Sequence, residues 1–113
     1  HGGIVAEADS LLKIVEATKS KWVGINLDTG NFHTDDVYGD IARCVRYAVN
    51  VQLKVEIRPR GAKQKSPADI SRIVGILRKG NYQGFVALEY EAATNPWTAV
   101  PQWLAKLKEA VNG

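Results

Sequence analysis

The sequence predicts an α/β fold that forms part of a (β/α) barrel, with three parallel strands and four helices. Three observations lead to this class. Segments that alternate like strands are separated by segments with helical spacing, the order expected of a parallel sheet. Each strand segment has aliphatic side chains on one face and small or polar ones on the other. Each polar face also ends in a carboxylate or an amide, side chains that are typical of a binding or catalytic site.

The first two helices are predicted from apolar spacing and from a capping residue. Residues 4–19 carry apolar side chains at helical intervals, which predicts an amphipathic helix. Asp36 is a suitable N-cap for a second helix over about residues 37–48. A strand is expected between them, over residues 22–28.

The last two helices have their own start and stop signals. Ser66 and Pro67 predict the start of the third helix, with Ser as N-cap and Pro at the first helical position. This helix should end at Gly80–Asn81. The pair Asn95–Pro96 opens the fourth helix, in which Pro101 is compatible with a short first turn before the main helix.

The strand segments 22–28, 49–60 and 84–91 determine the architecture. Parallel sheets covered by helices on both faces usually have strands that are apolar throughout. Such a cover would bury Gln52, Lys54 and Glu56 at a cost of several kcal/mol for each unpaired ion. A barrel instead turns the aliphatic face towards its helices and the polar face towards its lumen. A sheet with one solvent-exposed polar face is the alternative, and it requires no function.

Composition indicates an ordinary globular protein, organised as a single unit over residues 1–113. Hydrophobic residues make up 45%, charged residues 24%, and the formal net charge is +3. No apolar run reaches the roughly 18–20 residues of a membrane span and no signal peptide is visible, so a cytoplasmic location without membrane partners is expected. Five cations over residues 58–65 could hold an anion or form a solvated loop, and no nucleic-acid partner is expected.

Two further features concern Cys44 and the start of the chain. As the single cysteine, Cys44 excludes an intramolecular disulfide and a Cys-rich zinc site, and its apolar neighbours predict a buried thiol. The chain starts at His1 and contains no Met, which predicts a processed, truncated or cloned piece of a longer protein.

Polar side chains of the three strands are expected to converge at one rim of the lumen. Carboxylate and amide oxygens suit Mg²⁺ or Mn²⁺, whereas an imidazole would favour Zn²⁺. Two carboxylates beside a metal-held sugar could move a proton between adjacent carbons. A buried ion network, for example of Lys54 with Glu56 and Glu91, is the alternative. The converging residues are Asp28, Gln52, Lys54, Glu56, Glu89 and Glu91.

Four motifs carry a resemblance to a known family. The segments HGGI, NLDTGNF, VQLKVEIR and FVALEYE, in this order and spacing, resemble the C-terminal half of the sugar phosphate isomerase/epimerase family. These proteins are xylose-isomerase-like TIM barrels and are also similar to endonuclease IV-type DNA repair nucleases. The resemblance covers essentially the whole chain and implies that its strands are strands six to eight of the parent barrel.

The resemblance also implies site residues. It gives Asp28, Gln52 and Glu89 as ligands of one divalent metal (Mn²⁺, Mg²⁺ or Zn²⁺), with Gln52 where the family usually has a His. Glu89 and Lys54 would be catalytic. The expected contacts to a sugar or sugar phosphate are His1, Asn31 and Arg58.

The resemblance further implies that another Glu ligand lies on strand five, upstream of His1. The chain alone is therefore expected to be inactive as an isomerase and to bind metal weakly or not at all. Its partner would be the missing N-terminal half-barrel or a second copy of itself.

Three functions remain open at this stage. The first is proton transfer in a metal-dependent sugar isomerase or epimerase. The second is an AP-endonuclease-like phosphodiesterase, which requires a three-zinc cluster with several His ligands, whereas this chain offers only His1 and His33. His33 could be a ligand or proton carrier, or an exposed loop residue. The third is a half-barrel fragment that only self-associates.

Overall fold

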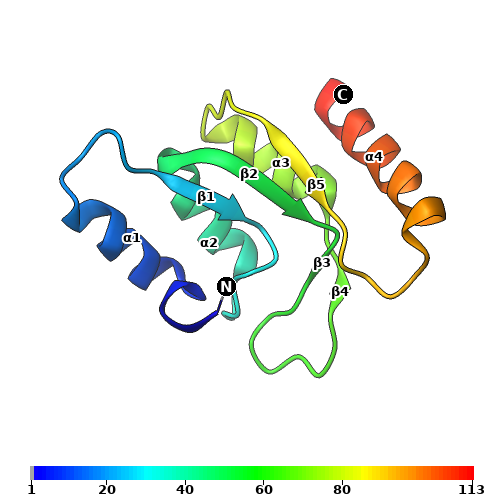
Figure 1. Cartoon of the computed structure of the whole chain (residues 1–113), viewed down its shortest axis with the longest axis horizontal. Coiled ribbons are helices and arrows are strands. Elements are labelled where there is room, and N and C mark those ends of the chain that lie inside the picture. Colours follow the sequence, from blue (N-terminus) through cyan, green and yellow to red (C-terminus); the bar gives the residue numbers. More distant parts are fainter. Residues whose placement is uncertain (1) are drawn as a thin grey trace.

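The computed structural model describes residues 2–113 and has the predicted α/β architecture (Figure 1). Three parallel strands form one sheet in the order β1-β2-β5, and a short antiparallel pair, β3-β4, extends beyond it. Four α-helices and two 3-10 helices, η1 and η2, complete the described chain. Their bounds are η1 Gly3–Val5, α1 Ala8–Ala17, β1 Ile25–Asp28, α2 Val37–Cys44, η2 Val45–Tyr47, β2 Ala48–Lys54, β3 Glu56–Ile57, β4 Ser66–Pro67, α3 Ile70–Lys79, β5 Val86–Glu89 and α4 Pro96–Asn112.

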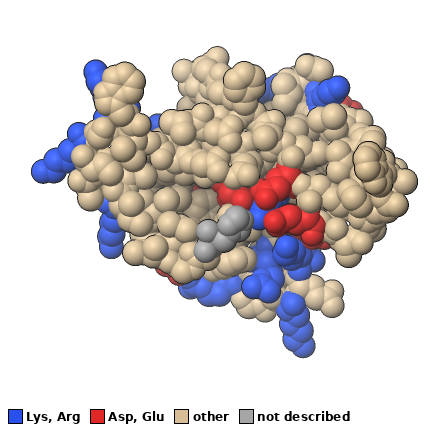
Figure 2. All heavy atoms as spheres, viewed as in Figure 1, with Lys and Arg blue, Asp and Glu red and all other residues tan. Residues whose placement is uncertain are grey.

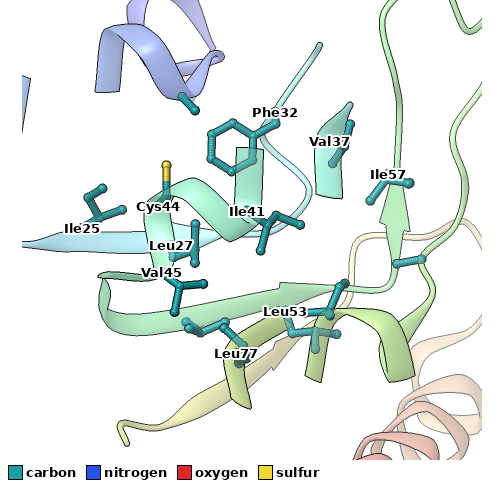
Figure 3. Close-up of a cluster of buried hydrophobic side chains, with 14 of the residues drawn as sticks. Ile25, Leu27, Phe32, Val37, Ile41, Cys44, Val45, Leu53, Ile57 and Leu77 are labelled. Carbon is teal, nitrogen blue, oxygen red and sulfur yellow. The ribbon is translucent and has the colours of Figure 1, made fainter. Parts of the chain in front are cut away.

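One face of the main sheet is covered and the other is open. Helices α2 and α3 lie behind the sheet, whereas α1 and α4 flank it (Figure 1). Leu27, Val51 and Leu53 point to the helical side and are fully buried, and Figure 3 shows Leu27 and Leu53 in the same cluster as Ile41 of α2. On the open side Asn26 is exposed. The predicted division between an aliphatic and a polar face is therefore confirmed.

The strands are shorter than predicted. The first begins at Ile25 rather than at residue 22, and Trp22 is 88% exposed. The helix expected over 37–48 ends at Cys44, because η2 follows and Ala48 already pairs with Ile25 of β1. The segment 49–60 is divided at Val55 between β2 and β3, and the last strand covers only 86–89.

The predicted start of the third helix is wrong. Ser66 and Pro67 form β4, which pairs antiparallel with β3. The helix begins at Ile70, and its N-cap is Asp69, whose carboxylate accepts a hydrogen bond of 2.9 Å from the backbone N–H of Arg72. Ser-Pro has a good local signal, but pairing with β3 keeps this dipeptide extended, and Asp69 caps equally well a few residues later.

Other helix ends agree with the sequence. Asp36 accepts from the N–H of Gly39, and Asn95 accepts from the N–H of Trp97, each at 2.9 Å. Helix α3 ends at Gly80, followed by Asn81 in the left-handed region. Pro101 does not separate a first turn, since α4 is continuous across it. Within residues 2–113 no helix has the length and apolar character needed to cross a membrane.

Candidate functional site

The buried ammonium of Lys54 is the centre of a polar cluster at the C-terminal ends of the three parallel strands. Asp28 ends β1, Lys54 ends β2 and Glu89 ends β5, while Glu91 follows two residues later. Lys54 Nζ lies 2.8 Å from Glu91 Oε2, 3.5 Å from Asp28 Oδ2 and 3.9 Å from Glu89 Oε1. Asn31 accepts a further hydrogen bond from the ammonium at 3.2 Å. The structure thus brings these five predicted polar residues together.

The turn after β1 positions both Asp28 and Lys54. The backbone N–H of Gly30 donates to Asp28 Oδ1 at 3.0 Å, which fixes that carboxylate. Thr29 is fully buried, and its hydroxyl accepts a hydrogen bond from the backbone N–H of Lys54 at 3.0 Å. The sequence Asp-Thr-Gly-Asn therefore builds one wall of the site by local hydrogen bonds.

Two buried carboxylate oxygens in this cluster, Asp28 Oδ2 and Glu89 Oε2, have no hydrogen-bond donor among residues 2–113. Asp28 Oδ2 is near Lys54 Nζ, but the 3.5 Å separation is an ion-pair contact and not a hydrogen bond. Buried carboxylate oxygens normally have partners, because desolvation of an unpaired charge is costly. With one ammonium against three carboxylates, the cluster has an excess of negative charge when all groups are ionised.

The pKa values of the cluster reflect this imbalance. Burial raises the pKa of Glu89, and the charge of Asp28 raises it further. Burial acts to lower the pKa of Lys54, but the hydrogen bond to Glu91 and the charges of Asp28 and Glu89 outweigh it and raise the pKa overall. The Lys54 ammonium lowers the pKa of Glu91. Lys54 is therefore held as a cation, while Glu89 ionises less readily than an ordinary glutamate.

Gln52 lies beside this cluster rather than within it. In the sheet register it pairs with Asp28, whereas Glu89 pairs with Lys54, one pleat nearer the strand ends. Asp28 and Gln52 thus lie at one level of the sheet, while Glu89 lies two residues further along the strands. The Gln52 side-chain oxygen accepts a hydrogen bond from Asn26.

The remaining predicted site residues lie at the edge of the cluster or outside it. Arg58 is exposed beyond β3, and its carbonyl oxygen is 3.2 Å from His33 Nδ1. Glu56 is half-buried and, among residues 2–113, forms no ion pair. The prediction for His1 lies outside the described residues. Figure 2 shows acidic side chains around a basic one on the open face, with further basic side chains beside them.

A partly apolar cavity adjoins the site. A cavity of about 240 Å³ lies along β1 and is lined by both strand and loop side chains. Asp28, Asn31 and Gln52 contribute the polar part of this lining. The cavity therefore lies at the free edge of the sheet, and Asp28 is part of its lining.

Comparison with known proteins decides the family. A family model described as xylose isomerase-like TIM barrel matches residues 1–108. The chain belongs to this family. The three-stranded sheet, with α2 and α3 on one face and polar strand ends on the other, corresponds to part of such a barrel. A comparison with curated proteins gave no match.

Membership of the xylose isomerase-like TIM barrel family explains why the site lies where it does, since such barrels carry their functional side chains at the C-terminal ends of the strands. Among residues 2–113, no three His, Cys, Asp or Glu side chains are grouped as a complete metal site. Sequence reasoning gave no role to Thr29 and Gly30 and left that of Glu91 open. The sequence did indicate a place for Glu91 in the site, because residues two apart in an extended chain lie on the same face and Glu91 follows Glu89 by two.

Proposed function

We propose that this chain is part of a metal-dependent sugar or sugar phosphate isomerase or epimerase that moves a proton between adjacent carbons. The observation that carries the proposal is a pair of buried oxygens, Asp28 Oδ2 and Glu89 Oε2, to which no side chain or backbone N–H of the described residues donates. Two such oxygens, one of them on a residue that lines a cavity, are a favourable environment for a cation. Family membership supports the same conclusion, as a likeness of fold.

The residues present fit a divalent metal held by oxygen. Asp28 and Glu89 would each supply a carboxylate oxygen, and Gln52 an amide oxygen after it releases Asn26. An all-oxygen set favours Mg²⁺ or Mn²⁺ over Zn²⁺. When bound, the metal would polarise a sugar carbonyl as a Lewis acid. Its double charge would also offset the excess negative charge of the cluster.

The protein side chains would perform the proton transfer and bind the substrate. Glu89 would accept or return a proton at Oε1, the oxygen not proposed to hold the metal, because burial and the charge of Asp28 raise the pKa of this carboxyl. Lys54, held as a cation, would stabilise negative charge that develops on a sugar oxygen. Asn31, in the loop after β1, and Arg58, in the loop after β3, would contact sugar hydroxyl or phosphate oxygens.

We also propose that further barrel strands complete the site. A closed barrel of this class needs about eight strands, whereas the main sheet described has three, with β1 and β5 at its edges. The activity assay therefore belongs on the protein that carries these remaining strands.

The test compares Glu89→Gln with Glu109→Gln, an exposed carboxylate on α4 that lies outside the site. The assay follows interconversion of aldoses, ketoses and their phosphates with Mn²⁺. Glu89→Gln should lower turnover by about 10²–10⁴-fold, the usual contribution of a positioned acid or base, while Glu109→Gln should not. Unchanged turnover in Glu89→Gln, or no turnover of any sugar by the unsubstituted protein, would contradict the proposal.

A non-catalytic, self-associating role is the second candidate. Trp22 and Phe85 are 88% and 87% exposed, and the edge strands β1 and β5 could pair with another chain. Sedimentation of the isolated 113-residue chain tests this role. A monomer across a wide concentration range would exclude it.

A further inference from the structure

The closest carboxylate to Lys54 is not one of the proposed metal ligands. Its ammonium is 2.8 Å from Glu91, but 3.5 Å from Asp28 and 3.9 Å from Glu89. The proposed ligands are thus the two more distant carboxylates. This order requires an explanation, because all three carry the same charge.

The environment of Glu91 differs from that of the other two carboxylates. Its side chain is 47% exposed, compared with 8% for Asp28 and 26% for Glu89. Glu91 therefore approaches the ammonium from the rim. With Asn31 accepting a second hydrogen bond at 3.2 Å, two of the three ammonium N–H groups have acceptors that are not proposed ligands.

Without Glu91, the nearest carboxylate oxygens for the freed N–H would be Asp28 Oδ2 and Glu89 Oε1. An ammonium that donates to these oxygens would neutralise them and occupy the space that a metal ion needs. A short movement would suffice, since the present distances exceed hydrogen-bond length by less than about 1 Å.

We propose that Glu91 is a positioning residue that holds the Lys54 ammonium away from Asp28 and Glu89 and so keeps their oxygens available to a divalent cation. The inference rests on the proposed function, because it concerns the same candidate metal site. Glu91 touches neither metal nor substrate in this role and acts through Lys54.

A double-mutant cycle with Glu91→Gln and Lys54→Met tests the proposal, with Mn²⁺ alone as the probe and electron paramagnetic resonance as the readout. Glu91→Gln should weaken Mn²⁺ binding on the order of tenfold when Lys54 is present, a coupling typical of contacting charged residues. In the Lys54→Met background the same substitution should change affinity by less than about twofold. Equal weakening in both backgrounds would mean that Glu91 acts through its own charge, and would overturn the proposal.

A second measurement requires no metal. Lysine ammonium ¹⁵N NMR should resolve Lys54 as a slowly exchanging, hydrogen-bonded group, and Glu91→Gln should shift or broaden this signal. Glu56→Gln is the matched control, because Glu56 lines the same small cavity as Lys54 and Glu91 but forms no ion pair with Lys54 among the described residues. It should leave the signal in place.

The two measurements separate the possible failures. If the unsubstituted protein, with its full barrel, binds no Mn²⁺, the proposed metal function fails, and the effect assigned to Glu91 on metal binding fails with it. If Mn²⁺ binds but the Lys54 signal is unaffected by Glu91→Gln, the metal function stands and only the role of Glu91 is wrong.

Discussion

Gly30 lies against the side chain of Lys54 so closely that no larger residue fits. A Cβ built on Gly30 would be 2.7 Å from both Cβ and Cδ of Lys54 and 2.9 Å from the carbonyl oxygen of Glu56. The glycine of the Asp-Thr-Gly-Asn turn therefore fixes the path of the lysine stem. The position of the ammonium depends on this contact as well as on its carboxylates.

Gly30→Ala should destabilise the fold by about 1–3 kcal/mol, the usual cost of overpacking a buried contact. Urea denaturation followed by circular dichroism measures this change. The Lys54 ammonium NMR signal should shift in the same variant, because the stem must move. A variant as stable as the unsubstituted protein would show that the turn can relax without cost.

Gly75→Ala should have the opposite effect. Gly75 lies inside α3, and a Cβ there would meet no atom within 4 Å outside its immediate helical surroundings. Alanine restricts the unfolded chain and favours the helix, so the free energy of unfolding should rise by up to about 1 kcal/mol. The same urea experiment measures it, and a loss of stability would reveal a contact that the structure lacks.

The N-terminus of α3 provides a third test. Asp69→Ala removes the acceptor of the Arg72 N–H and should cost about 1 kcal/mol. Ser66→Ala should change stability by less than about 0.5 kcal/mol, since Ser66 is exposed in β4 and does not cap the helix. Thermal or urea unfolding of both variants compares the two sites. A larger loss of stability in Ser66→Ala than in Asp69→Ala would mean that Ser66 caps the helix, as the sequence predicts.

Cys44 gives a pH-dependent prediction. Burial, with a further contribution from the charge of Asp40, raises the pKa of its thiol from 9.0 to about 11. Folding therefore favours the neutral thiol. The stability gained is fully present below pH 9 and is lost as the pH rises towards about 11. In this window the free energy of unfolding should fall by roughly 2–3 kcal/mol more in the unsubstituted protein than in Cys44→Ala.

Urea titrations of both proteins at several pH values measure this difference. Other groups that ionise between pH 9 and 11 contribute equally to both proteins, so the comparison with Cys44→Ala cancels them. Parallel slopes would mean that the thiol ionises normally in the folded state. As an independent check, native Cys44 should react slowly with iodoacetamide at pH 8 and rapidly once the protein is unfolded.

Much of the fold could be predicted because its causes are local. The alternation of Val51 and Leu53 with Gln52 and Lys54 requires one covered and one open face in any sheet that contains this strand. The caps at Asp36 and Asn95 likewise depend on the few residues around them. These features were confirmed.

The features that could not be predicted depend on residues far apart in the chain. Ser66 and Pro67 have a strong helix-start signal, yet pairing with β3 makes them a strand. The polar residues Asp28, Gln52, Lys54 and Glu89 belong to the same face of the sheet. The strand register nevertheless places Glu89 beside Lys54, two residues beyond Gln52. The local alternation excludes a one-residue slip of register, but an offset of two residues keeps every side chain on its face and is decided only in the folded sheet.

The sequence by itself determined that carboxylate, amide and ammonium groups stand at the ends of three parallel strands. That result follows from the two-residue period of a strand, which is a local property of the extended backbone. Only the tertiary structure decided which groups meet: Lys54 pairs most closely with Glu91, and one oxygen each of Asp28 and Glu89 has no donor in the described part of the chain. The physical reason is that distances across strands depend on register and on the close approach of Gly30, both of which exist only after folding.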